Sequence, residues 1–141
     1  MALRSFLATL LCASMLTACS ATQAAEPLGA TCDQLQATRT VEQASVVTAG
    51  SDLTVILCSN PSTGFSWEDP QLADTAVLQL VDRSYQVPGD ATMEIVGAAG
   101  GEVLTLHAVA AGTTTMTISY SQPWAGGTKG EWTYRLSVTV Q

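Results

Sequence analysis

The amino-acid sequence predicts an all-β fold, in which about seven strands form an antiparallel sandwich within a single domain. Val, Thr, Ala and Gly are abundant among the 141 residues, whereas charged residues make up only 12%. Short segments alternate between apolar and polar side chains, and Gly or Pro residues separate them. No long segment of the domain has the 3.6-residue period of a helix, which favours a sandwich over a helical bundle.

The N-terminal segment is expected to direct export and not to join the fold. Arg4 precedes an apolar run over residues 6–15, which is long enough for the hydrophobic region of a signal peptide and too short to cross a bilayer. The run leads into Leu16-Thr17-Ala18-Cys19, which resembles a bacterial lipobox. We therefore expect residues 1–18 to be a lipoprotein signal peptide and Cys19 to be lipidated.

The residues after the lipobox are expected to form a flexible tether over residues 19–30, because they are mostly small and polar. Lipid on Cys19 would be the only attachment to a membrane. Ser20 beside it favours the outer membrane, facing the periplasm, in a cell that has one. An ordinary signal peptide cut between residues 18 and 25 is the alternative, and it also exports the protein. The folded domain is expected to span residues 31–141.

The charge balance argues against one class of partner. Twelve acidic and five basic residues give a net charge of −7, and removal of Arg4 makes it about −8. Such a surface repels phosphate backbones and anionic lipid headgroups. We therefore do not expect nucleic acid among the partners.

Two cysteines are left for the folded domain once Cys12 is removed with the signal peptide and Cys19 carries lipid. An even pair in an oxidising compartment favours a disulfide between Cys32 and Cys58, which are 26 positions apart. Closing a loop of that length contributes about 3–4 kcal/mol in the chain-entropy model. Two buried free thiols are the alternative.

The strands are predicted in chain order from separate patterns. The first covers residues 39–47, and the second, residues 53–58, is apolar on both faces except for Thr54, as a central strand would be. A longer strand over residues 76–87 ends at Pro88-Gly89. The last three strands cover residues 103–109, 113–120 and 132–140, and they alternate most clearly.

Each of the last three strands has one face that is expected to be buried. These faces carry Leu104, Leu106 and Ala108; Thr114, Met116, Ile118 and Tyr120; and Trp132, Tyr134, Leu136, Val138 and Val140. Short strands with turn residues between them favour an immunoglobulin-like sandwich over a barrel. The chain nevertheless lacks the second, downstream Cys that marks a true immunoglobulin domain.

The segment after the second strand carries the clearest motif, Asn60-Pro61-Ser62-Thr63-Gly64-Phe65-Ser66-Trp67. Its residues from Asn60 to Phe65 are called the Asn-Pro loop below. Pro61 fixes one φ angle and Gly64 permits a positive one, so this loop is expected to form a tight tip that presents Thr63 outward. A tip that is ordered in advance loses little entropy on binding. A simple hairpin turn is the alternative for this segment taken alone.

Two further segments carry features of binding loops. The glycine loop, Gly97-Ala98-Ala99-Gly100-Gly101, comes just before the strand at residue 103, and its glycines let the backbone approach a partner closely. The tryptophan loop, Gln122-Pro123-Trp124, follows the strand that ends at residue 120. A Trp held beside a Pro offers a large apolar area and has few rotamers to lose. Trp124 is therefore expected to be exposed and to anchor a partner.

Taken together and in this order, the three loops resemble those of the chagasin family of cysteine protease inhibitors. The first family motif reads Asn-Pro-Thr-Thr-Gly-Tyr/Phe-x-Trp, from which the chain departs only at Ser62. Ala99 stands where the family commonly has Gly, and Gln122 stands where it has Arg. The resemblance covers residues 39–141 and implies a reversible inhibitor that plugs the cleft of a papain-like cysteine protease. The Asn-Pro loop would cover the catalytic Cys, the glycine loop would lie on the non-primed side, and Trp124 would stack on the primed side.

Other functions fit the sequence less well. A catalytic site would have to be built around His107, the only histidine, which alternation places on an outer strand face. A metal site of His107, Met93 and Met116 is disfavoured, because Met116 points inward and His107 outward. We therefore expect no enzymatic activity, no cofactor and a monomer. A noncatalytic envelope lipoprotein or adhesion module, using the same loops to bind another protein, is the alternative.

Overall fold

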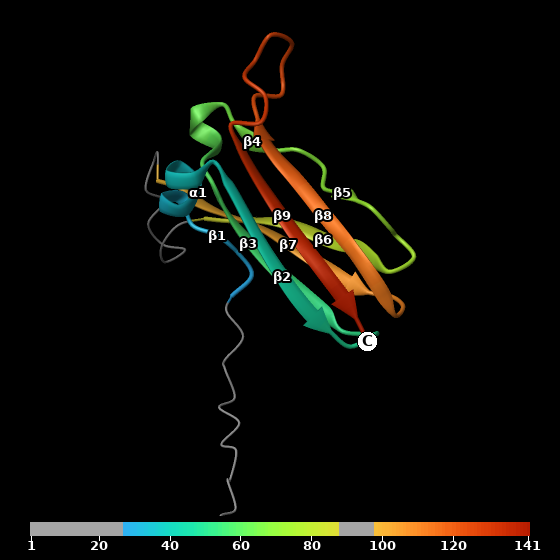
Figure 1. The fold of residues 1–141 in the computed structure, drawn as a ribbon. Helices are drawn as coiled ribbons and strands as arrows, with labels where there is room; N and C mark the ends of the chain where they lie inside the picture. The colour runs from blue at the N-terminus through green and yellow to red at the C-terminus, as the bar shows by residue number, and fades with distance from the viewer. Residues whose placement is uncertain (1–26, 88–97) are drawn as a thin grey trace, which may run out of the picture.

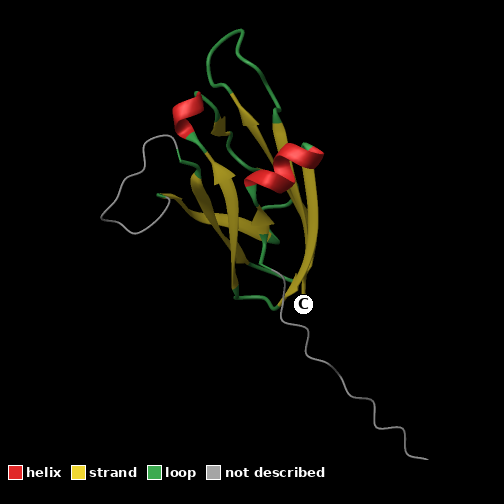
Figure 2. Ribbon diagram, turned by 90° about the vertical axis from the view of Figure 1, so that its left-hand side faces the viewer, coloured by secondary structure: helices red, strands yellow, loops and turns green. Residues whose placement is uncertain are grey.

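The fold is a β-sandwich of two sheets with one short α-helix, shown from two sides in Figures 1 and 2. The structure is a computed structural model, and it describes residues 27–87 and 98–141. Within these residues the elements are β1 (Gly29–Ala30), α1 (Cys32–Thr38), β2 (Thr40–Val47), β3 (Asp52–Ser59), the 3-10 helix η1 (Pro61–Thr63), β4 (Ser66–Trp67), β5 (Gln71–Leu72), β6 (Leu78–Gln86), β7 (Gly100–Ala108), β8 (Gly112–Ser121) and β9 (Trp132–Val140).

The two sheets are mixed rather than purely antiparallel. One has the strand order β1-β3-β7-β6 and the other β2-β9-β8-β4, with β5 also paired to β8. The β1–β3 and β2–β9 pairs are parallel, and the other pairs among the described strands are antiparallel. The predicted all-β sandwich is confirmed, but its description as antiparallel is wrong for these two pairs. Helix α1 carries the chain from one sheet to the other, and β2 then runs beside β9 in the same direction.

The core lies between the sheets, where the inward faces of the long strands meet. Alternation predicts these faces correctly, since Leu104, Leu106 and Met116 have no exposed surface and Tyr120 is 2% exposed. Burying each such side chain stabilises the fold by about 1.5–3 kcal/mol. The second predicted strand differs from expectation, because Ile56 of β3 is 46% exposed. A sheet in a two-layered sandwich has only one inner face, so an apolar residue on its other face stays at the surface.

The domain begins earlier than predicted at its N-terminal boundary. Gly29 and Ala30, which the sequence assigns to the tether, form β1 beside Ile56 and Leu57 of β3. Ala30 is only 6% exposed, so it belongs to the core. Residues 1–26, which include the expected signal peptide and lipidation site, lie outside the described residues.

Two strands start more than one residue away from the predicted position. β6 begins at Leu78 rather than at residue 76, because residues 74–77 form a turn. In this turn the Asp74 carboxylate accepts the Ala76 N–H at 2.8 Å, and the Asp74 carbonyl accepts the Leu78 N–H at 3.2 Å. β7 begins at Gly100 rather than at residue 103, which takes two glycines out of the expected loop.

The sequence patterns do not predict helix α1, because seven residues are too few to show a clear helical period. A capping box starts the helix: the Thr31 hydroxyl accepts the Gln34 N–H at 3.2 Å, and the Gln34 side chain accepts the Thr31 N–H at 2.9 Å. Leu35 is fully buried, and Arg39 ends the helix in a left-handed conformation with φ 62°. No helix in the described part of the chain is long and apolar enough to cross a bilayer.

Tyr134 of β9 joins strands from both sheets. Its hydroxyl donates to Oε1 of Gln43 on β2 at 2.6 Å, and the same oxygen accepts the N–H of Gly29 in β1 at 2.8 Å. The ring has no exposed surface, and burial raises the pKa of Tyr134 to about 12. This contact fixes β1 and the start of α1 to the second sheet.

Candidate functional site

Hydrogen bonds within the Asn-Pro loop order its tip. Gly64 follows η1 at φ 79°, a left-handed conformation that favours glycine. The N–H groups of Thr63 and Gly64 donate to the carbonyls of Asn60 and Pro61, both at 3.1 Å. The Thr63 hydroxyl donates to the Asn60 carbonyl at 2.7 Å, and Thr63 is exposed. The expectation of a tight tip that presents Thr63 outward is confirmed.

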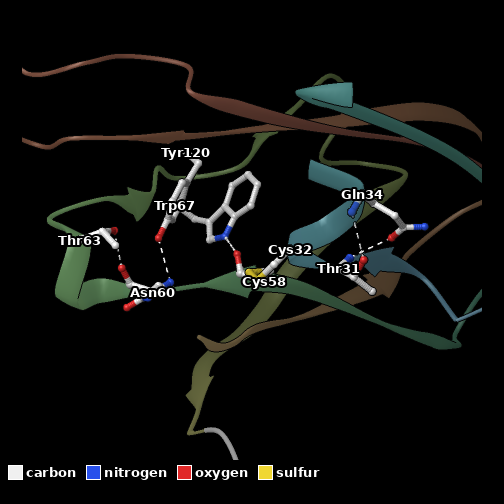
Figure 3. The surroundings of a disulfide bond; sticks show 8 residues. All are labelled: Thr31, Cys32, Gln34, Cys58, Asn60, Thr63, Trp67 and Tyr120. Carbon is white, nitrogen blue, oxygen red and sulfur yellow. Dashed lines mark hydrogen bonds between the residues drawn. A yellow bond between two sulfur atoms is a disulfide. The ribbon is translucent and has the colours of Figure 1, made fainter. Parts of the chain in front are cut away.

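Aromatic residues of the core hold both ends of the Asn-Pro loop, and Figure 3 shows two of them, Tyr120 at the start of the loop and Trp67 hydrogen-bonded to Cys58. At its start, the Asn60 N–H donates to the Tyr120 hydroxyl at 2.9 Å. At its end, Phe65 stacks on Tyr120 with ring centroids 5.5 Å apart. The indole N–H of the buried Trp67 donates to the Cys58 carbonyl at 2.9 Å. The sequence pattern assigns Tyr120 only to the core, whereas its hydroxyl also positions the loop.

The tryptophan loop is part of a hairpin over residues 122–131 that projects beyond the end of the sheets, at the top of Figure 1. Its neck is closed twice, since the Gln122 N–H donates to the Thr128 carbonyl at 2.8 Å and the Gln122 side chain accepts the Thr128 N–H at 2.9 Å. The Lys129 ammonium donates to the carbonyls of Gln122 and Trp124. The hairpin is therefore bonded across its base, and Trp124 remains 50% exposed.

The Asn-Pro loop and the tryptophan loop touch each other at Gly64. A Cβ atom built on Gly64 would lie 2.8 Å from Cη2 of Trp124 and 3.4 Å from its Cζ3. Only a glycine leaves room for the indole ring at this distance, because carbon atoms prefer separations of about 3.5–4.0 Å. Two segments that are about 60 residues apart in the chain therefore form one continuous surface.

The glycine loop is shorter than expected, since Gly100 and Gly101 belong to β7. Gly100 pairs with Ser59 of β3, and Gly101 pairs with Gln86 of β6. A Cβ atom on Gly100 would lie 2.3 Å from the Gln86 carbonyl oxygen, so packing within the chain itself explains this glycine. Gly97 lies outside the described residues.

Ala98 and Ala99 precede β7 and are described. Ala99 and Thr63 line the same cavity of about 260 Å³. Its other lining residues are Cys32, Gln36, Cys58, Asn60, Phe65, Tyr120, Glu131 and Trp132. The end of the glycine loop, the Asn-Pro loop and the tryptophan loop thus lie together at one end of the sandwich, opposite the C-terminus in Figure 1.

The predicted disulfide between Cys32 and Cys58 is present, with a distance of 5.1 Å between the two Cα atoms (Figure 3). The alternative of two free thiols is therefore wrong. The bond joins the first residue of α1 to the end of β3, two residues before Asn60. It fixes the helix to the same end of the sandwich as the three loops.

The three tryptophans have different environments. Trp124 is the strongly exposed one, as predicted, and Trp67 is 3% exposed. Trp132 is only partly buried, although alternation places it on the buried face. It lies at the start of β9, where its ring stacks on Tyr120 with centroids 4.7 Å apart and shields one side of the tyrosine.

His107 and Met116, the described candidates for a catalytic or metal site, lie in different environments. Nδ1 of His107 lies 2.6 Å from a carboxylate oxygen of Asp52, its neighbour across the β3–β7 pair. Met116 is buried, as expected, whereas Met93 lies outside the described residues. Residues 27–87 and 98–141 contain no group of three His, Cys, Asp or Glu that could hold a metal ion.

An ordered edge with an exposed aromatic residue, carried on a β-sandwich, is typical of a protein-binding surface. The family model for chagasin family peptidase inhibitors, I42, matches residues 46–138, about two thirds of the chain. The chain therefore belongs to this family of peptidase inhibitors. Because this is a family of inhibitors, the chain is not an enzyme. A comparison with curated proteins returned no match.

Two solved structures, one of them of a cysteine protease inhibitor, share the fold. The crystal structure of EhICP2 from Entamoeba histolytica, a cysteine protease inhibitor, matches with a TM-score of 0.55 and 21% identity, covering 72% of this chain and 96% of that one. The structure of PbICP-C in complex with falcipain-2 matches with a TM-score of 0.50 and 17% identity, covering 72% of this chain and 88% of that one. At these identities the likeness establishes the fold.

Proposed function

We propose that the protein is a reversible inhibitor of papain-family cysteine proteases, and that it fills the active-site cleft with three segments at one end of the sandwich. Membership of a peptidase inhibitor family supports this proposal, as does the fold shared with a cysteine protease inhibitor and with a protein bound to falcipain-2. The observation that carries it is the contact between Trp124 and Gly64, because this contact joins two of the segments into one edge.

In this mechanism the Asn-Pro loop covers the catalytic cysteine of the protease, with Thr63 at its centre. The Thr63 hydroxyl already donates to the Asn60 carbonyl. A loop that covers the catalytic thiol blocks access to it, so the proposed occlusion requires no covalent bond. Ordering a backbone residue costs about 1–2 kcal/mol, and the internal hydrogen bonds of the tip supply this order before binding. A pre-ordered plug is therefore expected to bind with little entropic cost.

The other two segments are proposed to flank the plug. Trp124 would stack on the primed side of the cleft, where its exposed ring face and its neighbour Pro123 offer apolar contact. Gly100 and Gly101 are already paired within the sheet, so Ala98 and Ala99 are the described residues of the glycine loop that face a protease on the non-primed side.

Inhibition of papain by the mature chain tests the proposal, with the inhibition constant Ki measured on a fluorogenic peptide substrate. Trp124→Ala is expected to raise Ki. The exposed half of the Trp124 side chain has an area of about 100 Å². Burying this area against a protease stabilises the complex by about 2.5 kcal/mol, so its loss raises Ki by up to about 70-fold. Val46→Ala is the control, because Val46 is 64% exposed and pairs with Thr139 near the opposite end. Absence of inhibition by the unmodified chain would refute the proposal and leave an envelope or adhesion module as the alternative.

We further propose that the protein is exported and anchored in the cell envelope through lipid on Cys19. The lipobox-like sequence supports this, and the disulfide between Cys32 and Cys58 is typical of an oxidising compartment. Metabolic labelling with an alkyne fatty acid in a bacterial host should mark the native chain and leave Cys19→Ser unlabelled. Equal labelling of the two chains would contradict the anchor.

A further inference from the structure

Helix α1 adds a feature to this end of the sandwich that the family match does not cover, since the match begins at residue 46. The disulfide between Cys32 and Cys58 joins the helix to the strand that leads into the Asn-Pro loop. At the other end of the helix, Arg39 pairs with Glu131 at the base of the hairpin that carries the tryptophan loop. The helix is therefore attached to both loops.

The cavity of about 260 Å³ lies among these three elements. Gln36 of α1, Asn60 and Thr63 of the Asn-Pro loop, and Glu131 of the hairpin contribute polar groups to its lining. Three aromatic residues also line it, namely Phe65, Tyr120 and Trp132. Because Thr63 lines the cavity and is exposed, a protein that covers Thr63 also faces the cavity.

The lining of the cavity favours a cation. Glu131 is the only charged residue among those that line it, and its side chain is 33% exposed. Arg39 contacts Oε1 of Glu131, whereas a carboxylate can accept several hydrogen bonds. Arg39 is itself 61% exposed, and ion pairs at such exposed positions are weak, so a second cation can share the carboxylate. Aromatic ring faces attract cations, and Phe65 and Trp132 can offer one, whereas Tyr120 is stacked between these two rings.

We propose that this cavity is a subsite for a Lys or Arg side chain on the protease surface next to the catalytic cleft. The inference rests on the proposed function, because the Asn-Pro loop must first bring a protease against Thr63. The basic group would lie near Glu131 and the Gln36 amide, and its aliphatic stem would contact the aromatic lining. The subsite makes α1 and Glu131 determinants of which proteases are inhibited.

The test compares Glu131→Gln with Arg39→Gln as inhibitors of papain at low and high salt. Both variants break the Arg39–Glu131 pair, but only Glu131→Gln removes the carboxylate. Glu131→Gln is expected to raise Ki about five-fold at about 0.05 M salt, and this difference should shrink at about 0.5 M. Arg39→Gln is expected to leave Ki unchanged or to lower it, because it removes a competing cation.

The outcomes separate the subsite from the inhibitory function. If both variants raise Ki equally, the effect comes from the lost ion pair and the subsite is refuted. If Glu131→Gln has no effect while Trp124→Ala weakens inhibition, the subsite is refuted and the inhibitory edge stands. If the unmodified chain does not inhibit papain, the proposed function fails and the subsite fails with it. Thermal unfolding of each variant shows whether a change in Ki accompanies a loss of folding.

Discussion

The contact between Gly64 and Trp124 predicts a specific effect of adding one methyl group. In Gly64→Ala the new Cβ would lie 2.8 Å from Cη2 of the indole, so the ring must move. Gly64 also has φ 79°, a conformation that costs a residue with a Cβ atom about 1–2 kcal/mol. The substitution therefore strains the Asn-Pro loop and displaces the tryptophan loop at once.

The size of the effect follows from these two terms. The free energy of unfolding is expected to fall by about 1–2 kcal/mol, because the strain is present only in the folded state. A ring that moves by about 1 Å loses part of its contact with a protease. If it forfeits half of the roughly 2.5 kcal/mol assigned to Trp124, Ki rises about ten-fold.

A double-mutant cycle checks this reasoning through Ki values for papain. Gly64→Ala should raise Ki by about ten-fold in the native background and by clearly less in the Trp124→Ala background, because the displaced ring is then absent. Urea unfolding of each variant checks that it is folded. If the two effects add to within about 0.5 kcal/mol, the loops bind independently and the single-edge account is wrong.

Other parts of the structure give three predictions. Replacing Cys32 and Cys58 together by serine should lower the free energy of unfolding by about 3–4 kcal/mol, and an unchanged urea midpoint would contradict this. Lys129→Met removes the ammonium that donates to two hairpin carbonyls, and it should raise Ki for papain by about five-fold. An unchanged Ki would show that the hairpin is ordered without the ammonium. The pKa of Tyr134 is about 12 in the folded state against 10.0 ordinarily, so the unfolded chain loses this proton first. The free energy of unfolding should therefore not depend on this group below pH 10, and it should fall as the pH rises toward 12. Urea midpoints of the native chain and of Tyr134→Phe, measured at about pH 8 and 11, test this expectation.

The sequence predicts the buried faces of the strands well, because a period of two is a direct consequence of burying one side of a strand. It does not predict strand direction, since β2 and β9 show the same alternation whether they are parallel or antiparallel. Helix α1 is missed for a related reason: two turns show little periodicity, and its capping box consists of Thr31 and Gln34, residues that occur in many loops.

The site is predictable where single residues dictate local geometry and not where distant segments meet. Pro61 and Gly64 indicate the shape of the Asn-Pro loop from the sequence alone. Gly100, by contrast, looks like a loop residue, but the neighbouring strand is what requires it to be glycine. The bond between Tyr120 and Asn60 joins residues 60 positions apart, and a pattern of local alternation carries no information about it.

Backbone hydrogen exchange of the chain, free and bound to papain, shows directly whether the three loops form one binding edge. Exchange is expected to slow on binding at residues 60–65, 98–99 and 122–127, which lie at one end of the sandwich. The turns at residues 48–51 and 109–111, at the opposite ends of β3 and β7, should be unaffected. Protection at those turns, with the three loops unchanged, would show that papain binds at the other end of the sandwich.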